Sequence, residues 1–136
     1  MSQRVEAILS AHPSDLGSID RAVLVECIDA CVECTQVCTA CADACLGEEM
    51  VADLVTCIRT NLDCADICAT TGTVLSRRTG FAASPTRAVV ETCRLACAIC
   101  AEECETHAGT HEHCRICAEA CRRCEQACTR LLVSLR

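Results

Sequence analysis

Six cysteines in one segment of the chain are spaced like the core positions of a helix. They are Cys27, Cys31, Cys34, Cys38, Cys41 and Cys45, with gaps that alternate between four and three residues. This is the spacing of the a and d positions of a heptad, so a helix would carry these thiols on one stripe about 27 Å long. Asp29, Gln36 and Asp43 fall on the opposite face. The segment therefore predicts a helix whose thiols face inward and whose polar residues face solvent.

Three further segments repeat the same spacing. The second has Met50, Leu54, Cys57, Asn61, Cys64, Cys68, Thr71 and Leu75 at its core positions. The third has Val90, Cys93, Cys97, Cys100, Cys104 and His107, and the fourth has Cys114, Cys117, Cys121, Cys124, Cys128, Leu131 and Leu135. All eighteen cysteines of the chain thus fall on four stripes. Asn61 stands where a cysteine is expected, and its amide could hydrogen bond to sulfur or coordinate a metal weakly.

The large number of aligned cysteines is better explained by the chemical reactivity of thiols than by packing. A single buried cysteine is ordinarily a small apolar packing residue. Leucine and isoleucine would fill four such stripes better, because small residues leave cavities that cost stability. Thiolate ligation of a soft metal is the chemistry that benefits from many equivalent sulfurs.

The geometry and charge of the array favour Cu(I) among the soft metals. Zinc and iron-sulfur clusters need a few ligands that converge on one point. A continuous row of cysteine pairs suits an ion that is content with two or three sulfurs. A buried array must also stay nearly neutral, so one Cu(I) for each displaced thiol proton, on the order of 18 ions, could be held. We therefore predict many Cu(I) ions per chain.

The sequence also indicates the cellular compartment of the protein and argues against membranes and nucleic acid as its partners. Residues 1–15 contain Arg4 and Glu6 and lack the apolar stretch of a secretory signal, so we expect a cytoplasmic protein with reduced thiols. The longest stretch without a charged residue is ten residues, 67–76, too short to span a membrane. A net charge of -7 and a single aromatic residue, Phe81, argue against nucleic acid. The arginine pairs 77–78 and 122–123 are expected to be solvated.

The expected fold is all-α, an up-down-up-down four-helix bundle with a short extra N-terminal helix. That helix is predicted at about residues 3–12, outside the main core, because Val5, Ile8 and Leu9 have helical spacing and Pro13 follows. The four cysteine segments then form a single bundle domain at about residues 18–135, since short turns make successive helices antiparallel neighbours.

Local signals predict where the four helices begin and end. The predicted N-caps are Ser18, Ser84 with Pro85 at the first helical position, and Thr110, and the predicted ends are Gly47 and Gly109. Glu48 and Glu49 are expected in the first turn of the second cysteine helix, where the helix macrodipole favours anions.

This topology predicts two different ends of the bundle. The turns at Gly47 and Gly109 lie at the same end, so Met50, His107, His111 and His113 should gather there. These side chains are candidate ligands for metal uptake, although a histidine can simply solvate a turn and Met50 can simply be a core residue. The opposite end collects bulky aliphatic residues, namely Val23, Leu24, Leu75, Val89, Val90, Leu131 and Leu132. Any metal traffic is expected at the histidine end.

The pattern resembles the bacterial copper storage proteins, specifically their cytosolic class. The resemblance spans about residues 19–135 and rests on CIDACVECTQVCTACADAC, CIRTNLDCADIC, CRLACAICAEEC and CRICAEACRRCEQAC. It implies a cysteine-lined four-helix bundle filled with Cu(I), a ligand role for each of the eighteen cysteines, and histidines near the opening. Assembly into a homotetramer is implied by the resemblance alone.

Two other functions compete with a non-catalytic copper store. A thiol redox enzyme or sensor needs one cysteine of unusual reactivity and another that resolves it, and no cysteine is singled out here. A zinc or cadmium buffer of the metallothionein type would use the same thiols. Competition with a Cu(I) chelator, beside a Zn(II) titration, separates that buffer from a copper store. The donor and recipient of the copper are not indicated by the sequence.

Overall fold

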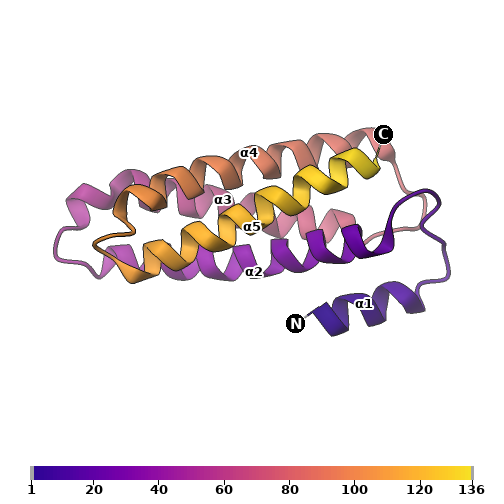
Figure 1. Ribbon diagram of the computed structural model, residues 1–136, viewed down its shortest axis with the longest axis horizontal. Helices are drawn as coiled ribbons and strands as arrows, with labels where there is room; N and C mark the ends of the chain where they lie inside the picture. Colours follow the sequence, from indigo (N-terminus) through magenta and orange to yellow (C-terminus); the bar gives the residue numbers. More distant parts are fainter. Residues whose placement is uncertain (1, 136) are drawn as a thin grey trace.

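The computed structural model describes residues 2–135 and places four long antiparallel helices side by side (Figure 1). The helices are α1 (Ser2–Ala11), α2 (Arg21–Leu46), α3 (Val55–Leu75), α4 (Ala83–His107) and α5 (Glu112–Ser134), with a short 3₁₀ helix, η1 (Val51–Leu54), before α3. The part of the chain that the structure describes contains no strand. The predicted all-α, up-down-up-down bundle with a short N-terminal helix is confirmed.

The interior of the bundle is formed by the predicted core positions. α2 packs against α3 and α5, and α4 packs against α3 and α5, so each long helix has two neighbours around a central axis. Residues three and four apart share a helix face, and these faces meet at the centre of the bundle. Gly72 of α3 lets the helices approach closely, because a Cβ there would lie 3.4 Å from Cβ of Cys31. The core is thus a closed column of small side chains.

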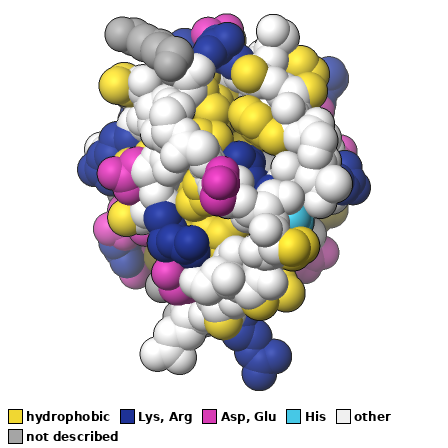
Figure 2. Space-filling view, turned by 90° about the vertical axis from the view of Figure 1, so that its right-hand side faces the viewer, with side chains coloured by type: hydrophobic (Ala, Val, Ile, Leu, Met, Phe, Trp, Pro, Cys, Tyr) yellow, Lys and Arg dark blue, Asp and Glu magenta, His cyan; other side chains and the backbone are white. Residues whose placement is uncertain are grey.

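The two ends of the column differ as predicted. Leu24, Leu75, Val90 and Leu131, which we call the aliphatic end, are at most 1% exposed. Figure 2 shows this end of the molecule, with apolar side chains visible in recesses between charged and polar ones. The turns after α2 and α4 both lie at the other end (Figure 1), which carries His107, His111 and His113 and is called the histidine end below.

α1 lies outside the four-helix bundle, as expected (Figure 1). Its Leu9 is buried against the core, whereas Ile8 is 72% exposed. Arg21 at the start of α2 donates a hydrogen bond to the hydroxyl of Ser10 at 2.9 Å. α1 therefore attaches to the bundle mainly through α2.

Most predicted helix caps are wrong by a few residues. α2 begins after Asp20, not Ser18, and the Asp20 carboxylate accepts a hydrogen bond from the backbone N–H of Val23 at 3.2 Å. The carboxylate already satisfies a free N–H of the first turn, so Ser18 has no capping role. Gly47 does follow the last residue of α2, as predicted, but with φ of −87° it is in the right-handed region.

The starts of the other helices also differ from the predictions. Glu48 and Glu49 are not in the first turn of a helix, because a turn and η1 separate α2 from α3. α4 and α5 begin after Ala82 and His111, neither of which makes a side-chain capping bond, so Ser84 and Thr110 are not caps. Extended backbone already occurs at Ala82 and His111, and the helices start from there.

Three charged residues expected in solvent are partly or fully covered. Arg78 is 5% exposed and lies 4.4 Å over the ring of Phe81. Arg123 on α5 contacts three carboxylates of α2, those of Glu26 at 2.9 Å, Asp29 at 2.9 Å and Glu33 at 3.1 Å. Asp29 is only 7% exposed. The prediction of solvated charge is therefore wrong for Arg78, for Asp29 and in part for Arg123. Arg78 lies against Phe81, and Asp29 and Arg123 cover each other where α2 meets α5.

Candidate metal centre

All eighteen cysteines line the interior of the bundle as free thiols. None is more than 2% exposed, so the prediction that every thiol faces inward is confirmed. α2 contributes six of them, and the rest come from α3, α4 and α5. The helical periodicity of the sequence alone places them there, because each occupies an a or d position.

Neighbouring sulfurs lie close enough together to bind the same metal ion. On one helix, the Sγ atoms of Cys34 and Cys38 are 3.6 Å apart. Between helices, Sγ of Cys38 lies 3.5 Å from Sγ of Cys121, and Sγ of Cys27 lies 3.8 Å from Sγ of Cys128. Such sulfur contacts recur along the core, from Cys27 and Cys128 near the aliphatic end to Cys41 and Cys114 near the histidine end.

The sulfurs gather into overlapping groups of four whose ligand atoms lie within 4.8 Å of one another. Four such groups are Cys31, Cys93, Cys124 and Cys128; Cys34, Cys68, Cys97 and Cys124; Cys34, Cys38, Cys64 and Cys121; and Cys38, Cys100, Cys117 and Cys121. Cys34, Cys38, Cys121 and Cys124 each belong to two of these groups. Separate tetrahedral sites would need separate ligands, so the shared members favour bridging thiolates.

Burial keeps Cys45 and Cys114, two thiols near the histidine end, protonated. Removal from water raises the pKa of Cys45 to about 11 and that of Cys114 to about 12. These thiols are therefore neutral near pH 7, and a metal ion that binds them must displace a proton.

Asn61 occupies the gap in the α3 row and is fully buried. Its Oδ1 accepts hydrogen bonds from the thiols of Cys117 at 2.9 Å, Cys100 at 3.1 Å and Cys104 at 3.8 Å. Its Nδ2 donates to Sγ of Cys57 at 3.4 Å. Asn61 thus makes the hydrogen bonds to sulfur that the sequence suggested as one of its two roles.

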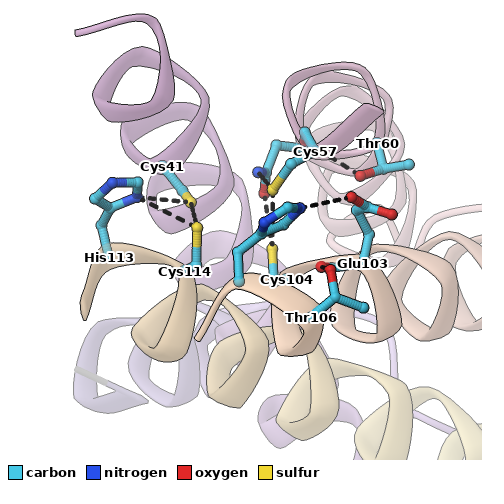
Figure 3. Close-up of polar contacts among 10 residues, drawn as sticks. Cys41, Cys57, Thr60, Glu103, Cys104, Thr106, His113 and Cys114 are labelled. Atoms are coloured by element: carbon cyan, nitrogen blue, oxygen red, sulfur yellow. Dashed lines mark hydrogen bonds and ion pairs between the residues drawn. The ribbon is translucent and has the colours of Figure 1, made fainter. Parts of the chain in front are cut away.

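One group of four at the histidine end includes an imidazole. It consists of Cys41, Cys45, His113 and Cys114. Nδ1 of His113 lies 3.3 Å from Sγ of Cys41 and 3.6 Å from Sγ of Cys114, and Figure 3 shows the ring directed at both sulfurs. His113 is thus the candidate histidine that the fold brings to the thiol core.

The other candidates at this end are placed differently. His111 is 8% exposed and stacks on His113, with ring centroids 5.4 Å apart. His107 points to its own helix, where its Nε2 lies 2.9 Å from Oε2 of Glu103. Met50 lies in the turn before η1 and is 46% exposed, so it is not a core residue of a helix as its spacing suggested.

Sequence reasoning missed Glu48 as a member of this site. Its Oε2 lies 2.8 Å from Nε2 of His113 and 3.1 Å from Nδ1 of His111. The His113 hydrogen bond, and the charge of both rings, lower the pKa of the Glu48 carboxyl. The available signal was the predicted meeting of the two turns, which puts the residue after Gly47 beside the residues after Gly109.

A family model described as copper storage protein matches residues 20–133 of the chain. The chain belongs to the copper storage protein family. The matched range contains all eighteen cysteines, Asn61, Glu48 and the three histidines of the histidine end.

Solved members of this family have the same fold. The copper storage protein Ccsp of Streptomyces lividans, in a structure loaded with 10 copper equivalents, is 58% identical, with 96% of this chain and 98% of that chain covered and a TM-score of 0.94. A structure of the cytosolic copper storage protein of S. lividans with five coppers is 60% identical over 82% of this chain and 93% of that chain, with a TM-score of 0.81.

Two more distant proteins also match the chain. The Cu(I)-bound copper storage protein BsCsp3 is 34% identical, covers 78% of this chain and 94% of its own, and has a TM-score of 0.69. The uncharacterized cysteine-rich protein YhjQ of Bacillus subtilis is 35% identical over 102 residues, which are 75% of this chain and 89% of that protein.

Proposed function

We propose that this protein stores and sequesters Cu(I) at high capacity through its eighteen cysteine thiolates, and that it does so without catalysing a reaction. The observation that carries the proposal is the set of overlapping four-sulfur groups, in which Cys34, Cys38, Cys121 and Cys124 are shared. Shared thiolates suit a monovalent soft ion that accepts two or three bridging sulfurs. Such a store would protect other thiol and iron-sulfur sites of the cell from free copper.

The charge of the core sets the capacity. The thiols are buried, and an uncompensated charge in this environment is costly. One Cu(I) in place of one thiol proton leaves the charge of the core unchanged, so roughly 18 ions can be accommodated. Each Zn(II) would displace two protons, so a neutral core would hold about half as many.

Copper uptake is assigned to the histidine end. His113 lies against Cys41 and Cys114 there and is 26% exposed on its side chain, so it is accessible to an arriving ion and close to the first thiols. His107, with a side chain 21% exposed, and His111 stand beside this route. The four buried residues at the other end have aliphatic side chains, which offer an arriving metal ion no ligand atom.

The family relationship supports a compartment and an assembly. No helix among residues 2–135 has both the length and the apolar character to cross a membrane. The S. lividans relative is a cytosolic protein, and we assign the same compartment to this chain. Self-association into a homotetramer is expected from the resemblance to the cytosolic class, and Leu95 and Ile99 on α4, 51% and 58% exposed, supply apolar surface for it.

A zinc or cadmium buffer is the second candidate, favoured by the presence of four sulfurs within 4.8 Å in each group. Anaerobic titration of the reduced protein separates the two functions. The copper store predicts a Cu(I) plateau near one ion per cysteine, resistance to a Cu(I) chelator of known affinity, and displacement of Zn(II) by Cu(I). A Cu(I) plateau between one and four ions per chain, or retention of Zn(II) against Cu(I), would reject it.

A further inference from the structure

One carboxylate oxygen contacts both stacked histidine rings at the histidine end. Oε2 of Glu48 lies 2.8 Å from Nε2 of His113 and 3.1 Å from Nδ1 of His111. The two rings are stacked with an interplanar angle of 20°, so the oxygen meets opposite nitrogens of two nearly parallel imidazoles. Glu48 comes from the turn after α2, and both histidines come from the start of α5.

These contacts fix which nitrogen of each neutral ring carries the proton. An ionised carboxylate only accepts hydrogen bonds, so the nitrogen that faces it must be the N–H donor. In His113 that nitrogen is Nε2, and the lone pair is then on Nδ1, which faces Sγ of Cys41 at 3.3 Å. In His111 the donor is Nδ1, and the lone pair is on Nε2, which is buried and has no hydrogen-bond partner among residues 2–135.

We propose that Glu48 is a positioning residue for copper uptake, which holds His113 in the tautomer whose free Nδ1 lone pair points at Cys41 and Cys114. The proposal rests on the proposed role of His113 at the site of uptake. Ligand histidines are commonly oriented by a carboxylate at the second ring nitrogen, and loss of such a carboxylate typically weakens metal binding 10- to 100-fold.

Glu49 serves as a control that separates the specific contacts of Glu48 from a general effect of negative charge. Glu49 follows Glu48 in the same turn, carries the same charge and is exposed, whereas the Glu48 side chain is 32% exposed and contacts both rings. If the turn needed only negative charge near the histidines, replacement of Glu48 or Glu49 would have similar effects. The geometry assigns the effect to Glu48 alone.

The tautomer is measured directly by long-range ¹H–¹⁵N correlation spectra of the reduced, metal-free protein. In the wild type and in Glu49→Ala, the ¹⁵N shifts of His113 are expected to show a protonated Nε2 and an unprotonated Nδ1. In Glu48→Ala the two tautomers should mix, and Glu48→Gln, which keeps a neutral acceptor, should fall between. A single Nε2–H tautomer in Glu48→Ala would overturn the proposal.

The consequence for copper is measured by stopped-flow capture of the first Cu(I) equivalent, followed by titration to saturation. Glu48→Ala should slow capture, or weaken the first binding event, by about 10-fold and leave the capacity unchanged within one ion. Glu49→Ala should match the wild type. The double variant Glu48→Ala/His113→Ala should be no slower than His113→Ala, because Glu48 acts through that ring.

Failure of this proposal can be told apart from failure of the proposed uptake route. If His113→Ala slows the first capture and Glu48→Ala does not, the route stands and the positioning role of Glu48 is rejected. If His113→Ala captures copper like the wild type, the route through His113 is rejected, and the role of Glu48 in uptake falls with it. A saturation near 18 ions in either case leaves the storage function intact.

Discussion

The thiol of Cys117 donates a hydrogen bond to Oδ1 of Asn61 over 2.9 Å, at a point in the core where both residues are fully buried. The same oxygen accepts from Cys100 at 3.1 Å, so one amide of α3 joins α4 and α5 in the metal-free protein. A thiol can donate only while it is protonated. The metal-free bundle is therefore stabilised by the protons that copper would later displace.

Replacement of Asn61 tests this stabilisation. Asn61→Ala should lower the free energy of unfolding of the metal-free protein by about 2–4 kcal/mol, because it leaves a cavity and removes the acceptor from buried thiols. Chemical denaturation at pH 7 under reducing conditions measures the change. Asn61→Cys is the matched variant, since it completes the α3 row and should raise the Cu(I) capacity by about one ion. An unchanged midpoint for Asn61→Ala would show that the amide contributes nothing to the stability of the metal-free bundle.

The raised thiol pKa values predict a loss of stability in alkali. The pKa of Cys45 is about 11 and that of Cys114 about 12 in the folded protein, above the ordinary value near 9.0. Both states hold the protons below pH 8, so stability is fully present there. Between pH 9 and 12 the unfolded chain releases its protons first, so stability falls as pH rises.

Urea unfolding of the metal-free protein at pH 8 and pH 10.5 checks this prediction. The midpoint should be lower at pH 10.5, and Cys45→Ala/Cys114→Ala should show a smaller drop between the two pH values. A midpoint that rises with pH would contradict the assignment.

Arg123 is predicted to matter for stability more than its surface position suggests. Arg123→Met should cost about 1–3 kcal/mol in the free energy of unfolding, because it leaves the 7% exposed carboxylate of Asp29 without its cation. Arg130→Met on the exposed face of the same helix is the control and should change stability by less than about 0.5 kcal/mol. Equal effects of the two substitutions would mean that the contacts of Arg123 with α2 contribute no more than an ordinary surface charge.

Removal of thiols at the aliphatic end should reduce capacity without affecting uptake. Sγ of Cys27 and Sγ of Cys128 are 3.8 Å apart there, far from His113 along the bundle. Cys27→Ser/Cys128→Ser should lower the Cu(I) plateau by about two ions, one per cysteine. Metal analysis of the saturated protein gives the plateau, and stopped-flow gives the capture rate, which should not change. The matched Cys41→Ser/Cys114→Ser variant loses the same number of thiols but should also capture the first ion more slowly.

The sequence predicted the positions of the thiols well because the heptad spacing of the cysteines determines which side of each helix is buried. A cysteine at an a or d position of a four-helix bundle faces the core, and all eighteen cysteines of the chain do so. The all-α fold and the two different ends followed from the same pattern, once short turns made the helices antiparallel.

Features that depend on a neighbouring helix were not predictable in this way. Asp29 lies opposite the thiols on α2 and was expected in solvent, but Arg123 of α5 covers it. Glu48 was interpreted through the dipole of its own helix, whereas its contacts are with His111 and His113, more than sixty residues later. Ser18 and Asp20 are both good N-cap residues, and only the path of the backbone selected Asp20.

The aliphatic residues Leu24, Leu75, Val90 and Leu131 close one end of the sulfur column. If copper ions enter and leave only at the histidine end, the ions bound first and deepest are released last. Ions beside Cys27 and Cys128 would leave only after those beside Cys41 and Cys114 had gone. Chemically equivalent ligands would then supply two kinds of copper, a small fraction that exchanges quickly and a deeper reserve that is withdrawn last.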